Sequence, residues 1–112
     1  SVDIDPDTLN LASTGKRISA YIELPEGYDV ADIIVSTIKL DDTIPVGLSV
    51  PIVIGDYDAD GIQDLMVKFD RQALIGYLKS QGIKDAEVTL TLTGKVGETQ
   101  FRGTDTVKVI GK

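Results

Sequence analysis

The chain has 112 residues, of which 42% are hydrophobic and 26% are charged, and its formal net charge is −7. This length and composition indicate a single globular domain. So negative a surface repels phosphates, which excludes nucleic acid as a partner and argues against anionic membranes. The chain has neither Cys nor His, which removes Cys/His zinc sites, disulfides, thiol nucleophiles and imidazole bases. No apolar run approaches the roughly 20 residues of a membrane span, so we expect no membrane insertion.

Alternation of polar and apolar residues predicts strands along most of the chain. Such alternation is typical of strands that bury one face and wet the other. In chain order the candidates are SVDI (1–4), RISAYIEL (17–24), STIKL (36–40), SVPIVI (49–54), DLMVKFD (64–70), EVTLTLTG (87–94) and DTVKVI (105–110). The segment TGKVGE (93–98) predicts a hairpin connection between the last two.

One segment has the period of a helix instead. Asp70 is placed to cap its first turn, Gly82 is placed to end it, and we expect a helix over about 71–81. The apolar residues at helical spacing are Leu74, Ile75 and Leu78. Short strands with one helix predict a mainly β fold, a two-layer antiparallel β-sandwich of immunoglobulin-like or jelly-roll-like type, formed by 1–112 as a single domain.

The segment GDYDADGIQD (55–64) carries the strongest chemical signal. Carboxylates occupy loop positions 1, 3, 5 and 9, glycine occupies position 6, and position 7 can offer a backbone carbonyl. These residues are Asp56, Asp58, Asp60, Asp64, Gly61 and Ile62. Alternate spacing lets oxygens converge on one point, as Ca²⁺ requires. Without a cation the four charges repel one another, whereas a solvated acidic turn is the plainer alternative.

The flanks of this loop distinguish it from the helix–loop–helix calcium hand. That motif places a Glu at position 12, where this chain has Val67, and the flanking segments here are strand-like. The loop resembles the strand–loop–strand calcium loops of FG-GAP-type propeller repeats. The resemblance implies side-chain ligation by Asp56, Asp58, Asp60 and Asp64 and carbonyl ligation by Ile62. A propeller needs several such repeats, and this chain has one.

A wider resemblance covers about Val2 to Ile110. The opening VDIDPDTLNL, the turn DVADI, the aspartate loop and the closing TGKVGETQFRGTD are similar, in order and spacing, to a domain of secreted and surface proteins of archaea and bacteria. The resemblance implies an extracellular or cell-surface accessory module of a larger protein, with other domains or subunits as partners. It implies no activity.

These observations favour a non-catalytic module with structural Ca²⁺ that serves structure, adhesion or assembly. A carbohydrate-binding module with structural calcium is the alternative, although the chain has no Trp and only 5% aromatic residues. The plainer interpretation of each Tyr is a surface packing residue. An enzyme is disfavoured because the same aspartates are better used as ligands. We expect Asp41, Asp42 and Asp105 to be turn or solvated surface residues.

Overall fold

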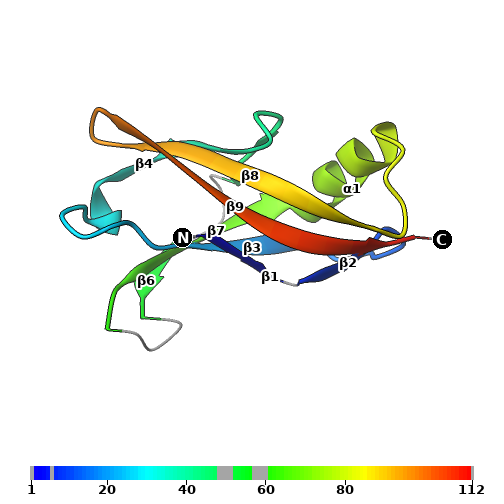
Figure 1. The fold of residues 1–112 in the computed structure, drawn as a ribbon, viewed down its shortest axis with the longest axis horizontal. Coiled ribbons are helices and arrows are strands. Elements are labelled where there is room, and N and C mark those ends of the chain that lie inside the picture. The colour runs from blue at the N-terminus through cyan, green and yellow to red at the C-terminus, as the bar shows by residue number, and fades with distance from the viewer. Residues whose placement is uncertain (1, 6, 48–51, 57–60, 112) are drawn as a thin grey trace.

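The computed structural model describes residues 2–5, 7–47, 52–56 and 61–111 (Figure 1). Within these ranges the chain forms a two-layer sandwich with one α-helix at one end, which confirms the predicted architecture. The first sheet has the order β1 (Val2–Asp5), β3 (Arg17–Ile22), β7 (Asp64–Asp70), β6 (Val53–Gly55). The second has the order β2 (Thr8–Asn10), β9 (Thr99–Ile110), β8 (Ala86–Val96), β4 (Ile33–Leu40), β5 (Ile44–Pro45). The helix is α1 (Arg71–Ser80), and a 3-10 turn, η1 (Val30–Asp32), precedes β4.

The N-terminal segment contributes to both sheets. β1 pairs antiparallel with β3 in the first sheet, and β2 pairs with β9 in the second. The β2–β9 pair is parallel, with Thr8 opposite Lys108 and Leu9 opposite Val109, which departs from the purely antiparallel arrangement predicted. The physical reason is that β1 and β2 follow one another closely in the chain but take their partners from different layers.

A second segment changes sheets at the opposite edge. Ile44 and Pro45 pair with β4, and the Val46 amide still donates to the Ile38 carbonyl at 3.1 Å. The next amide, that of Gly47, donates to the Lys68 carbonyl of β7 at 2.8 Å. The two layers are therefore joined by backbone hydrogen bonds along both edges.

The predicted inward faces form the core. The buried strand residues include Ile18, Ala20, Ile22, Leu65, Val67, Phe69, Leu90, Leu92, Val107 and Val109. Full burial of each large aliphatic or aromatic side chain contributes about 1.5–3 kcal/mol. β6 differs, because Ile52, Val53 and Ile54 beside and within it are all exposed. β6 is an edge strand of three residues, so the alternation expected for SVPIVI does not correspond to a buried face in the part described.

Local signals set both ends of α1 as predicted. The Asp70 carboxylate accepts hydrogen bonds from the amides of Gln72 and Ala73. At the other end Gly82 has φ +71°, and its amide donates to the Lys79 carbonyl. The Ile83 amide donates to the Leu78 carbonyl, which completes a Schellman cap. The buried residues of the helix are Leu74, Ile75 and Leu78.

Asp41 links three elements around the β4–β5 turn. Asp41 and Asp42, which were expected to be turn or solvated surface residues, both have positive φ, 48° and 53°. The Thr43 amide donates to the Leu40 carbonyl, which closes a type I′ turn. The Asp41 carboxylate accepts from the Thr91 amide of β8 at 2.8 Å and from the Tyr77 hydroxyl of α1 at 3.1 Å. One side chain thus fastens the helix and the central strand of the second sheet to the turn.

Replacing Tyr77 with Phe should lower the free energy of unfolding by about 0.5–1.5 kcal/mol, because the half-buried Asp41 carboxylate loses one donor. Urea unfolding measures the change. Tyr28→Phe, at a residue that is 49% exposed, is the control and should stay within about 0.5 kcal/mol of the unmodified protein. Equal losses in both variants would contradict the proposed role of Asp41.

Candidate metal centre

The aspartate loop connects two paired strands, as its flanks predict. β6 and β7 are antiparallel, with Gly55 opposite Asp64, so Asp56 leaves one strand directly beside the first residue of the other. Asp58 and Asp60 lie outside the described residues. The loop ligands that the structure does place are Asp56, Ile62 and Asp64, and together with Asp58 and Asp60 they are called the loop group below.

The two described carboxylates of the loop group occupy different environments. Asp56 is exposed, and its Oδ2 accepts a hydrogen bond from the Gly61 amide at 2.8 Å. Gly61 has φ +85°, a conformation that side chains rarely adopt, which fits the sharp bend expected at position 6. Asp64 is only 3% exposed and is the one charged residue among the described residues that is buried. Ile62 is 50% exposed, which leaves its side chain outside the fold.

The burial of Asp64 bears on the alternative that the loop is only a solvated acidic turn. Its burial means that Asp64 is not a solvated turn residue. A buried carboxylate needs a hydrogen bond, an opposite charge or a cation, and among the described residues every buried side-chain oxygen and nitrogen has a hydrogen-bond partner. Asp64 occupies loop position 9 and is the first residue of β7, opposite Gly55 at the loop end of β6. The oxygen-rich donor set of the loop group fits a hard cation such as Ca²⁺.

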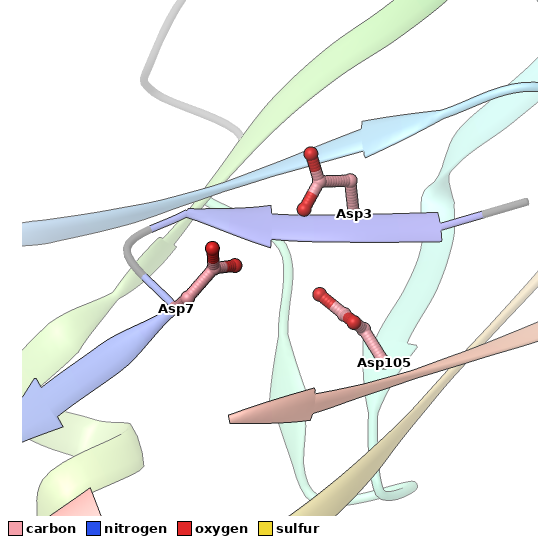
Figure 2. A group of neighbouring side chains, drawn as sticks. All are labelled: Asp3, Asp7 and Asp105. Atoms are coloured by element: carbon pink, nitrogen blue, oxygen red, sulfur yellow. The ribbon is translucent and has the colours of Figure 1, made fainter. Parts of the chain in front are cut away.

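Three other carboxylates meet where the N-terminal segment changes sheets. Oxygens of Asp3, Asp7 and Asp105 lie within 4.8 Å of one another, and Figure 2 shows them converging from β1, from the residue before β2 and from β9. These three residues are called the seam group. Asp105 is half-buried within β9, and its Oδ2 accepts a hydrogen bond from the Ile4 amide of β1 at 2.8 Å. The expectation that Asp105 is a turn or solvated surface residue is therefore wrong.

Sequence reasoning missed the seam group because its members are far apart in the chain. The alternating carboxylates of VDIDPD are a sequence signal for Asp3 and Asp7. The contribution of Asp105 depends on the pairing of β9 with β2, which brings it to them. Acidic residues often gather at surfaces without an ion, and the hydrogen bond from Ile4 already gives Asp105 a structural role.

The pKa of Asp3 reflects both its partial burial and the negative charges around it. The pKa of Asp3 is raised above its ordinary value of 3.8, first by partial burial and then by the negative charges of Asp105, Asp7 and Asp5. Ionisation of Asp3 is thus harder in the folded protein than in the unfolded chain.

Comparison with protein-family models, with curated proteins and with solved structures returns no match to this chain. Among the described residues, no helix combines the length and the apolar character needed to cross a bilayer. Function is therefore inferred from the residues and their arrangement.

Asp3→Asn should raise the melting temperature of chelator-treated protein at pH 7. Well below pH 3.8 the Asp3 carboxyl is protonated in both the folded protein and the unfolded chain, so it does not affect stability there. As pH rises through the raised folded-state pKa the unfolded chain loses its proton first, so stability falls and stays lower at neutral pH. The gain should disappear in acid. Thermal scans between pH 2.5 and 7 measure it, with exposed Glu98→Gln as the control. A loss of stability in Asp3→Asn at pH 7 would contradict net repulsion.

Proposed function

We propose that this chain is a non-catalytic extracellular module that binds structural Ca²⁺ through the loop group. The side-chain ligands are Asp56, Asp58, Asp60 and Asp64, and Ile62 contributes its backbone carbonyl. The observation that carries the proposal is the spacing of carboxylates at loop positions 1, 3, 5 and 9, the last of which, Asp64, is buried at the start of β7. This combination favours a cation cage over a solvated acidic turn.

The position of the loop supports a stabilising role for the ion. In the part of the chain that the structure describes, β6 has three residues and pairs only with β7, so this hairpin has little packing of its own. A cation held between Asp56 and Asp64 would fasten the end of β6 to the start of β7. Binding to the folded state alone adds about 2.7 kcal/mol when free calcium is 100-fold above its dissociation constant. That is a substantial share of the 5–15 kcal/mol typical of a folded domain.

An extracellular setting suits such a site. Extracellular calcium modules function with dissociation constants of about 0.1–1 mM, which a peripheral loop of this kind can reach. The module would serve structure, adhesion or assembly of a larger surface protein, with neighbouring domains or subunits as partners. The absence of His and Cys and the use of the aspartates as ligands support a non-catalytic role.

Calcium added to chelator-treated protein should raise the melting temperature by roughly 10 °C or more at saturation, since each kcal/mol is worth about 4–8 °C in a domain of about this size. Magnesium should have a much smaller effect, because it demands a smaller octahedral site. Asp58→Asn keeps the side-chain volume but removes a charge, and it should abolish most of the calcium response. Differential scanning calorimetry measures the calcium effect, the magnesium effect and the calcium response of Asp58→Asn.

Asp3→Asn in the seam group is the matched control, because it removes one acidic charge away from the loop. It should leave the calcium response intact. If Asp3→Asn abolished the response and Asp58→Asn preserved it, calcium would bind at the seam and the loop assignment would be wrong. If neither calcium nor magnesium changed the melting temperature of the unmodified protein, the proposed function would lose its basis.

A further inference from the structure

Two adjoining hollows lie at one end of the sandwich, near the β8–β9 hairpin. Their volumes are about 290 and 500 Å³, close to or within the range of about 300–1,000 Å³ that ligand sites occupy. They share the lining residues Leu24, Pro25 and Tyr28, which places the two hollows side by side. The first has an apolar floor that includes Ile22 and Phe101. The second extends to the aspartate loop at residues 61–63.

Tyr28 stands where the two hollows meet, on a backbone held from both sides. Its amide donates to the Pro25 carbonyl at 3.2 Å, and Gly27 has φ +94°, which together form a type II turn. Asp29, the next residue, caps η1 by accepting from the Ala31 amide at 2.9 Å. The Tyr28 side chain is nonetheless 49% exposed. An aromatic ring on a fixed backbone is a preorganised contact surface, because little of its freedom is lost on binding.

Polar groups of complementary kind border this ring. Gln100 and Arg102, from β9, line the first hollow and are hydrogen-bond donors. Glu26 and Asp29 line the second hollow and supply carboxylate acceptors. A sugar ring matches this chemistry, since its hydroxyl groups both donate and accept while its C–H face is apolar enough to lie on a tyrosine.

The charges that line the two hollows indicate which ligands they disfavour. The carboxylates of Glu26 and Asp29 and the net charge of −7 disfavour an anionic ligand such as a polyuronate. The first hollow carries both the guanidinium of Arg102 and the carboxylate of Glu23, so its lining favours neither sign of charge. We propose that the two hollows form a binding groove for a neutral oligosaccharide of at least two rings, one of which stacks on Tyr28.

Most of the residues that line this groove lie outside the proposed calcium site. The first hollow and Tyr28 use no residue of the loop group, and only residues 61–63 at the far wall belong to the aspartate loop. Calcium and glycan binding are measured independently, so the failure of one leaves the other testable. Chelation should weaken glycan binding modestly, through the far wall, without abolishing it.

The experiment uses the full chain in affinity electrophoresis against neutral polysaccharides, namely β-glucans, xylans, mannans and starch. Polygalacturonate and a Lys-rich peptide, the latter followed by calorimetry, are the charged probes. Calorimetry with oligosaccharides of two to six rings then gives the affinity for the best match. Tyr28→Ala should weaken binding by about tenfold or more, whereas Tyr28→Phe keeps the ring and should stay within about threefold. Arg102→Gln should weaken binding by about three- to tenfold.

Ile52→Ala is the matched control, because Ile52 is an exposed apolar residue, at 43%, that does not line either hollow. It should bind as the unmodified protein does, and thermal scans confirm that each variant is folded. Saturable binding of a neutral glycan that requires the Tyr28 ring supports the proposal. Three outcomes would overturn it: no saturable binding to any neutral glycan in the panel, binding that Tyr28→Ala leaves unchanged, or preferential binding of polygalacturonate or of the basic peptide.

Discussion

Two segments that belong to both sheets hold the sandwich together. Each layer has one apolar face and is stable only when the other layer covers it. The chain has no disulfide to enforce this contact, since it has no Cys. Instead β1 and β2 divide their backbone pairing between the layers at one edge, and residues 44–47 do so at the other. The hydrogen bond from the Ile4 amide to Asp105 adds a side-chain link at the first edge.

With the layers joined along both edges, the two ends of the sandwich are left to the helix and to the hairpin loops. α1 closes one end, with its buried residues against the core, and the β6–β7 hairpin and the β8–β9 hairpin extend toward the other (Figure 1). The proposed calcium loop and the proposed glycan groove both belong to this second end, and they share the wall formed by residues 61–63. A rigid body with adaptable loops at one end is a common arrangement for binding modules. It lets recognition change with little cost to the core.

How far the sequence predicts this structure depends on the range of each signal. Alternation along the strands and the caps at Asp70 and Gly82 are local, and the structure confirms them. The seam group and the parallel β2–β9 pair depend on residues about a hundred positions apart, which no local pattern encodes. The exposure of Ile52, Val53 and Ile54 was not predicted, because alternation of polar and apolar residues cannot distinguish an edge strand from a central one. The calcium ligands stay a prediction, because Asp58 and Asp60 lie outside the described residues.

The link between Ile4 and Asp105 has a consequence for the order in which the chain can fold. The two residues are separated by 101 positions, and β2 pairs with the last residues of β9. During synthesis β2 therefore cannot pair with β9 until residue 110 has been made, whereas β1 can pair with the nearby β3 earlier. Contacts of such long range slow folding and leave strand edges open in the meantime. The local β8–β9 hairpin is the natural place for the second sheet to begin, and the addition of β2 to its edge comes later.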